Sequence, residues 1–204
     1  MNKKGYRIAH EASNVISDEY IGLLDRDEYN SAISHVCELI RAAYTLFKAN
    51  SFAPSVFLSI TVFEEIAKIK AGHMRSWGED RDYVKRHKDS LFQHKLKHKI
   101  TVDSFYNCER ISNSIGKDRS IEFFSKYESG EYSSFREESL YFSRNKHELH
   151  IPSEKIGLRL AAEHLLIAIE IFSDEFWGMS GEASKICDTT NDLYSNVESV
   201  LKNS

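Results

Sequence analysis

The scarcity of helix breakers is the feature that most constrains the fold of this chain. Its 204 residues include only 9 glycines and 2 prolines, the residues that interrupt regular structure most strongly. Long stretches without either residue favour long helices. Hydrophobic residues form 41% of the chain and charged residues 28%, which is typical of one globular domain with a packed core.

Apolar residues recur with helical spacing in two segments of the first half. Steps of three and four residues predict a helix over 29–49, started by Asn30 or Ser31. Pro54 suits the first turn of a second helix that extends to about Trp77. This helix is apolar nearly all round, so we expect it to be the central buried one.

The rest of the chain gives weaker helical patterns and one strong one. Seven Lys or Arg and three His over 81–99 predict one basic helix. A last strong helix, opened by Pro152 and Ser153, is expected to end near Trp177. Weaker segments are a helix over 103–127, a loop over 128–134 and a short helix over 136–146.

Together these patterns predict an all-α fold, a single bundle of four to six helices. The bundle is expected to span 29–177, after an N-terminal extension over 1–28. A polar tail over 178–204, with at most one short helix, is expected to follow it.

Charge and cysteine content exclude several classes of protein. A net charge of −4 lacks the basic excess of a duplex-DNA binder. Three single, widely spaced cysteines, Cys37, Cys108 and Cys187, fit neither a disulfide framework nor a zinc pair, so we expect a cytoplasmic protein. No signal peptide or membrane-spanning run is recognisable. Without a Gly-rich phosphate loop or a Glu-x-x-His motif, we expect no cofactor and no metal. A zinc site built from His and Glu side chains is the alternative.

Two adjacent glutamates interrupt the apolar second helix. The spacing places Glu65 in a hydrophobic stripe with Val62 and Ile69, and a buried carboxylate requires a cationic partner. We expect a partner from the turn over 94–98 or Lys68. The alternative is a surface Glu–Lys pair beside one half-buried glutamate. Lys68 also has the i+4 spacing for an ion pair with Glu64.

Basic and imidazole groups alternate in the second half of the basic segment. His94 and His98 are one helical turn apart and are interleaved with Lys95 and Lys97. Such a set suits an anion such as RNA phosphate. A solvated basic face without a ligand is the alternative.

The segment Arg144-Asn145-Lys146-His147-Glu148-Leu149-His150 combines an arginine with two histidines. An imidazole can move the proton of a ribose 2′-hydroxyl while a guanidinium stabilises the phosphate, which cleaves RNA without a metal. We expect Arg144 and His150 to be catalytic and to point into one cleft, with His147 as a further candidate. Chance produces similar Arg–His spacings, as at Arg81/His87 and Arg159/His164, and His164 is expected to be a hydrogen-bonded core residue.

Three segments in order resemble the abortive-infection AbiV family, a branch of the HEPN helical domains. They are Ser55-Val-Phe-Leu-Ser-Ile-Thr-Val-Phe-Glu-Glu-Ile-Ala-Lys68, His94-Lys-Leu-Lys97 and Arg136-Glu-Glu-Ser-Leu-Tyr141. The resemblance implies a bacterial anti-phage protein that halts translation or growth, with Arg136 and Tyr141 supporting the site. Many HEPN relatives are metal-independent ribonucleases with an Arg-x4–6-His motif across a dimer cleft, which by position implies Arg144, Asn145 and His150 here.

Two hypotheses follow from these patterns. The first is a homodimeric effector that attacks or binds RNA of the translation machinery. The second is a non-catalytic helical dimer that binds a phage or host protein or RNA. The dimer is expected because the first and last strong helices both carry broad apolar faces.

Overall fold

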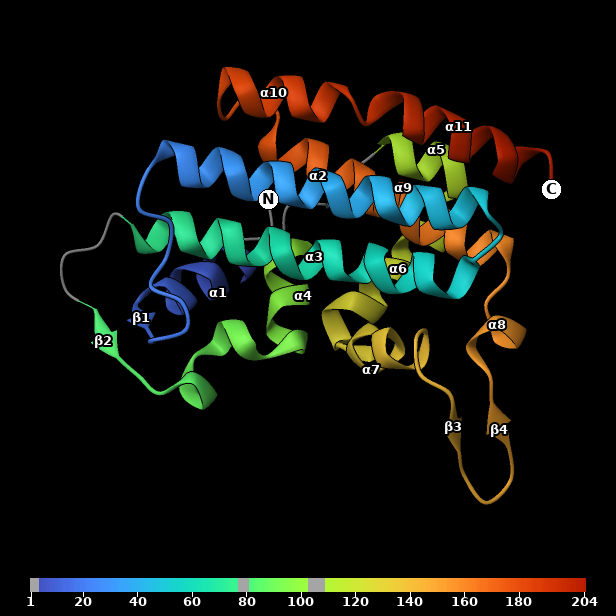
Figure 1. The fold of residues 1–204 in the computed structure, drawn as a ribbon, viewed down its shortest axis with the longest axis horizontal. Coiled ribbons are helices and arrows are strands. Elements are labelled where there is room, and N and C mark those ends of the chain that lie inside the picture. The colour runs from blue at the N-terminus through green and yellow to red at the C-terminus, as the bar shows by residue number, and fades with distance from the viewer. Residues whose placement is uncertain (1–3, 77–80, 103–108) are drawn as a thin grey trace.

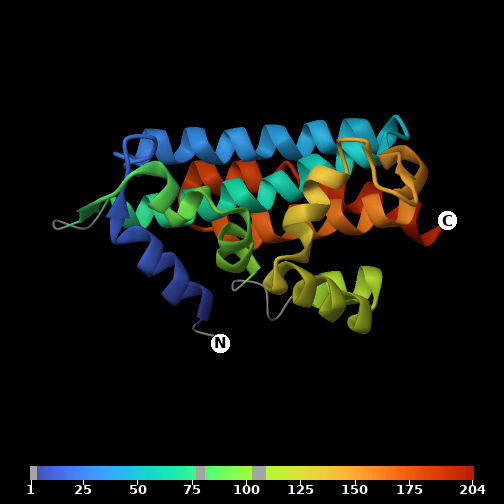
Figure 2. The ribbon, with the colours of Figure 1, turned by 90° about the horizontal axis from the view of Figure 1, so that it is seen from below.

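The computed structural model describes residues 4–76, 81–102 and 109–204. Three long helices form its centre: α2 (Arg26–Lys48), α3 (Phe52–Arg75) and α9 (Leu158–Phe176). They lie side by side in both views (Figures 1 and 2). The predicted all-α bundle is therefore confirmed, and two of its long helices match their predicted ranges within three residues. The third predicted helix begins later, because α8 (Pro152–Lys155) precedes α9 and is separated from it by Ile156 and Gly157.

The first long helix begins at a reciprocal cap that the sequence prediction missed. The Asp25 carboxylate accepts a hydrogen bond from the Glu28 backbone N–H at 2.8 Å, and the Glu28 carboxylate accepts one from Leu24 N–H at 2.8 Å. The pair of bonds resembles a capping box, except that Glu28 bonds the N–H of the residue before the N-cap Asp25. The predicted starting residue Asn30 is instead buried inside α2, where it bonds Glu182 and Ser180 of the C-terminal segment.

The central helix α3 is buried on most sides, as its composition predicts. Residues such as Val56, Ile60 and Phe63 have no exposed surface, and they belong to one core with the apolar faces of α2 and α9. Those two faces are therefore used inside the chain. Because the apolar faces of α2 and α9 are buried inside the chain, they cannot form a dimer interface. The homodimer stays a prediction.

Four shorter helices follow in the chain: α4 (His94–Val102), α5 (Glu109–Ile115), α6 (Lys117–Ser129) and α7 (Glu131–Glu138). Helices α4 and α7 pack on α3, α6 packs on α4 and α7, and α5 packs on α6 and α9. These pieces bring the number of helices above the predicted four to six. The predicted loop over 128–134 is wrong, since α6 and α7 are separated only by Gly130, whose φ of 83° lies in the left-handed region.

The basic segment over 81–99 is not one helix. It contains the short strand β2 (Asp82–Tyr83), two 3-10 turns (Arg86–Lys88 and Ser90–Phe92) and only the start of α4. The cause is Asp89, which caps the second turn by accepting from Leu91 N–H and is held by Arg75. A helix through this segment would remove Asp89 from that position.

Buried contacts tie the predicted N-terminal extension to the bundle. Helix α1 (Lys4–Ser13) packs on α3 and α4, and strand β1 (Val15–Ile16) pairs in parallel with β2. Arg75 donates to the Ala12 and Tyr20 carbonyls and to both Asp89 carboxylate oxygens. Both charged side chains have 0% exposure.

The C-terminal tail is more ordered than its polarity predicts. Two helices, α10 (Gly181–Asp188) and α11 (Asn191–Lys202), lie along the bundle on the α2 and α9 side (Figure 1). Each buries a few residues, such as Cys187 and Tyr194. In the part of the chain that the structure describes, no helix has the length and apolar character needed to span a membrane.

Candidate functional site

Four basic side chains surround one buried carboxylate, that of Glu64. Its oxygens lie 2.7 Å from His94 Nδ1 and 2.6 Å from Lys97 Nζ, and 3.4 Å from His98 Nε2. Arg136 Nε lies 3.5 Å away. The Glu64 side chain is 3% exposed. We call these five residues the Glu64 cluster.

Three separate elements form the Glu64 cluster. Glu64 comes from the middle of α3, the two histidines and Lys97 come from the first turns of α4, and Arg136 comes from α7. Each element contributes one of the segments on which the family resemblance rests. The sequence prediction had placed these residues in separate roles, and the structure brings them to one carboxylate.

Of the two partners expected for Glu65, the turn over 94–98 and Lys68, the structure shows Lys68, and the turn binds Glu64 instead. Glu65 pairs with Lys68 at 2.8 Å, and its side chain is half-buried at 23% exposure. Neighbouring helical residues differ by about 100° in direction, so only Glu64 faces α4 and α7. The predicted i+4 pair between Glu64 and Lys68 is not formed, although the alternative Glu65–Lys68 pair is.

The charges of the Glu64 cluster fix its protonation. Burial alone raises the pKa of Glu64, but the nearby His98 ring, the hydrogen bond and charge of Lys97, and the charge of His94 lower it far below its ordinary value. The pKa of His98 is lowered, chiefly by burial, so this ring is neutral. Glu64 is thus an ionised carboxylate whose negative charge is balanced inside the fold.

This arrangement changes the predicted phosphate-binding set. Lys97 and His98 are buried against Glu64, while Lys95 is exposed and His94 is partly exposed. A solvated basic face that includes Lys97 and His98 does not form, because both side chains face the interior. Of the four predicted residues, only His94 and Lys95 reach the surface.

The Arg–His pair on α9 is structural. His164 has no exposed surface and its Nδ1 lies 3.0 Å from the Tyr127 hydroxyl, which agrees with the expected core histidine. Its neighbour Glu163 is bound by Arg119 and Arg159. The spacing between Arg159 and His164 therefore results from packing of the core.

The four predicted catalytic residues lie on one β-hairpin. Strands β3 (Ser143–Arg144) and β4 (Leu149–His150) pair antiparallel and stand away from the helices (Figure 1). The Asn145 side chain accepts hydrogen bonds from the backbone N–H groups of His147 and Glu148, both at 2.8 Å. Asn145 therefore stabilises the turn, and the helix predicted over 136–146 ends at Glu138 instead.

The hairpin register separates the predicted pair. Arg144 is opposite Leu149, and Ser143 is opposite His150. Opposed residues share a face and successive residues alternate, so Arg144 and His150 project from opposite faces. The expectation that they point into one cleft within a chain is not met, because the segment is a hairpin and not a helix.

The environments of the two residues also differ. The Glu138 carbonyl accepts a hydrogen bond from His150 Nε2 at 2.8 Å, which anchors the hairpin to the end of α7. The Arg144 side chain is exposed and makes no hydrogen bond or ion pair with the described residues. Sequence spacing alone gave no sign of this difference.

Apolar side chains gather where α7 ends and the hairpin begins. Phe142 is 73% exposed and Tyr141 is 59% exposed. Leu140 and, on β4, Leu149 are exposed as well. We call these four residues the hairpin surface; single exposed apolar residues are common, but four large ones within residues 140–149 mark a candidate interaction site.

Comparison with known families identifies the chain. The model of the AbiV family, HEPN_AbiV, matches residues 26–173, a range that includes α2, α3, the Glu64 cluster, the hairpin and most of α9. The chain belongs to the AbiV family. Membership indicates a role in abortive infection, a form of phage defence. No curated protein and no solved structure matches the chain.

Two further features of this AbiV protein concern metals and thiols. Among residues 4–76, 81–102 and 109–204, no group of three or more His, Cys, Asp or Glu is arranged to hold a metal ion. Cys37 and Cys187 are buried free thiols, and Cys108 lies outside the described residues.

Proposed function

We propose that this AbiV protein stops growth of the infected cell by binding a protein partner through the hairpin surface, without cleaving RNA within a single chain. The observation that carries the proposal is the hairpin itself. It projects from the bundle with Tyr141 and Phe142 exposed at its base, and its register directs Arg144 and His150 to opposite faces.

The composition of the hairpin surface favours a protein over RNA. Exposed aromatic residues and a nearby arginine are enriched at the centres of protein interfaces. The charges around them are mixed, since Arg144 and Lys146 are accompanied by Glu137, Glu138 and Glu148. RNA binding through phosphates would require a local basic excess, which this composition does not provide.

A metal-independent ribonuclease is the second candidate, and the accessibility of the hairpin favours it. Arg144 is exposed and the His150 bond to the Glu138 carbonyl uses Nε2–H, which leaves Nδ1 as the nitrogen able to accept a proton. Because the pair diverges within one chain, this activity requires Arg144 of one copy and His150 of another. Mixing Arg144→Ala and His150→Ala chains would then restore cleavage that neither chain has alone.

Phage challenge of cells that express matched variants tests the binding proposal. We expect Tyr141→Ser/Phe142→Ser to remove protection, because it replaces the apolar contact surface and leaves the buried core intact. Ile121→Ser is the control, since Ile121 is 56% exposed on α6, away from the hairpin, and should protect like the wild type.

The melting temperature of each variant, measured in parallel, should stay at the wild-type value because the replaced side chains are exposed. Full protection by the folded double variant would contradict the proposal. Loss of protection by Ile121→Ser to the same extent would also contradict it.

A further inference from the structure

The hairpin of β3 and β4 has two strand edges with which no further described strand pairs. Its sheet consists of these two strands in the part of the chain that the structure describes. The Asn145 N–H donates to the Glu148 carbonyl at 3.1 Å, so these opposed residues form a hydrogen-bonded pair. Bonded and non-bonded pairs alternate along an antiparallel ladder. The backbone groups of the next pair, Arg144 and Leu149, therefore point outward, away from each other.

The outer edge of β3 thus carries open hydrogen-bonding groups. No described residue outside the hairpin bonds the backbone N–H or C=O of Arg144, or those of Phe142, which precedes the strand by one residue. Because backbone groups at an uncovered strand edge can pair with another chain, such an edge is a template for an added strand. The β3 edge can accept one without any change in the hairpin.

One face of the hairpin combines an arginine with two exposed apolar side chains. Phe142 and Arg144 are two positions apart on one side of the hairpin, and Leu149 is opposite Arg144, so the three share a face. Phe142 is 73% exposed and Leu149 is 42% exposed. The other face carries His150, whose ring bonds the end of α7. We call Phe142, Arg144 and Leu149 the strand face; it is the face without this bond to the bundle.

The strand face has one positive charge and no carboxylate. Glu148, the one carboxylate of the hairpin, lies on the face of His150 and is paired with Lys155. The Arg144 guanidinium has no ion pair with the described residues. A single free guanidinium between apolar side chains suits one carboxylate of a protein, whereas a chain of phosphates would require several cations.

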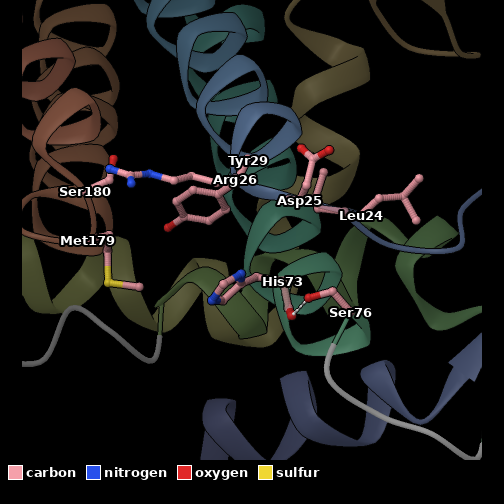
Figure 3. Close-up of a pocket in the computed structure, with 9 residues that line it drawn as sticks. Leu24, Asp25, Arg26, Tyr29, His73, Ser76, Met179 and Ser180 are labelled. Atoms are coloured by element: carbon pink, nitrogen blue, oxygen red, sulfur yellow. Dashed lines mark hydrogen bonds between the residues drawn. The ribbon is translucent and has the colours of Figure 1, made fainter.

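Arg26 is an exposed arginine in a different setting. It lines a pocket together with Tyr29 at the start of α2 (Figure 3). Exposed carboxylates of Asp25, Asp27 and Glu28 flank it in the sequence, and they weaken its attraction for another acidic group. It therefore provides a matched control for Arg144.

We propose that the β3 edge binds an extended segment of the partner protein as an added strand, with a carboxylate of that segment on Arg144 and its apolar side chains against Phe142 and Leu149. This inference rests on the binding function proposed above and names the chemistry of the partner. Main-chain hydrogen bonds provide the affinity of strand addition, and alternate side chains provide its specificity. The segment should be rich in β-branched residues and should place an acidic and an apolar residue two positions apart.

Selection from a random library of eight-residue peptides displayed on beads, with the full chain as bait, tests this inference. Arg144→Pro is the bait for counter-selection, because proline removes the outward N–H together with the guanidinium. We expect the recovered peptides to share β-branched residues and an acidic residue two positions from an apolar one. A basic consensus or a helical spacing of apolar residues would overturn the inference. Recovery no higher than with Arg144→Pro would overturn it too.

Titration of one recovered peptide, followed by fluorescence anisotropy, separates the charge from the backbone bond. Arg144→Ala should weaken binding roughly tenfold to a hundredfold, as for loss of a charged hydrogen bond. Arg144→Pro should bind roughly threefold to tenfold more weakly than Arg144→Ala, because it also lacks the N–H. Arg26→Ala should bind like the wild type. Equal binding by Arg144→Ala and the wild type would contradict the inference.

Two methylated peptides test strand addition on the wild-type chain, so that this arm does not depend on how a variant folds. Each carries methyl groups on one alternate set of backbone nitrogens, and only one set faces β3 in an added strand. One peptide should therefore bind roughly tenfold more weakly than the other. Equal binding of the two would overturn strand addition.

Phage challenge and light scattering separate this inference from the function on which it rests. We expect Arg144→Pro and Tyr141→Ser/Phe142→Ser both to lose protection. Protection kept by Arg144→Pro alone would overturn strand addition and leave the hairpin surface as the binding site. A wild-type dimer that Arg144→Pro converts to a monomer would assign the edge to a second copy of the chain, and would overturn the inference as well.

Discussion

Replacing Glu64 with glutamine is expected to lower the free energy of unfolding by roughly 3–5 kcal/mol, because it leaves the buried Lys97 without its counter-charge. Arg136 is affected less, since it keeps its pair with Glu137. For a chain of this size, the melting temperature should fall by roughly 6–20 °C. Glu65→Ala is the matched control, since it breaks a partly exposed pair with Lys68 and should cost less than about 1 kcal/mol. Thermal unfolding of both variants measures the contrast.

The same cluster predicts how stability depends on pH. The folded-state pKa of Glu64 is lowered, so its contribution is fully present above the unfolded value of about 4.3 and is lost as the pH falls below it. The free energy of unfolding of Glu64→Gln should therefore fall less steeply than that of the wild type as the pH decreases below about 4.3. Equal melting temperatures for Glu64→Gln and Glu65→Ala would show that the charge of Glu64 contributes nothing to the fold.

Replacing Arg75 with methionine is expected to lower the free energy of unfolding by about 3–5 kcal/mol, because it too leaves a buried charge without its partner. Asp89 would remain at 0% exposure without its bidentate partner, and the Ala12 and Tyr20 carbonyls would lose their donor. Because these bonds hold α1 and β1 against the bundle, limited proteolysis should cut the variant near residue 20 first. Denaturant unfolding gives the magnitude.

Two comparisons make this prediction specific to the buried pair. Arg86→Met should leave stability nearly unchanged, since the Arg86–Glu19 pair is exposed and 3.6 Å apart. Arg75→Met/Asp89→Asn should recover part of the loss, because the stranded charge is removed. A double variant less stable than Arg75→Met would contradict the mechanism.

The central helices were predicted correctly because their pattern depends only on the spacing of apolar residues that are close together in the sequence. The apolar residues of α2 and α3 repeat every three or four positions, and no breaker interrupts them. The tail was misjudged because α10 and α11 each bury few residues, such as Cys187 and Val197, within polar surroundings. So few apolar positions give a weak pattern, although they suffice to attach a short helix.

The site residues were harder to predict because their roles depend on contacts between distant segments. Glu64 and Glu65 are alike in sequence, and only the positions of α4 and α7 decide which one is buried. The hairpin lacks the alternation of apolar residues that signals strands. It forms because Asn145 satisfies two backbone N–H groups and His150 bonds the end of α7. The prediction of one helix over 81–99 was wrong because Arg75 holds Asp89 at a turn.

Incubation of the purified protein with total cellular RNA in EDTA tests the central claim most directly, namely that this AbiV protein acts by binding and not by cleavage. The wild type and Arg144→Ala/His150→Ala are compared at equal concentration, with both folds checked by circular dichroism. The account predicts intact RNA in both samples. RNA cleaved by the wild type and left intact by the double variant would contradict it and would assign catalysis to the hairpin.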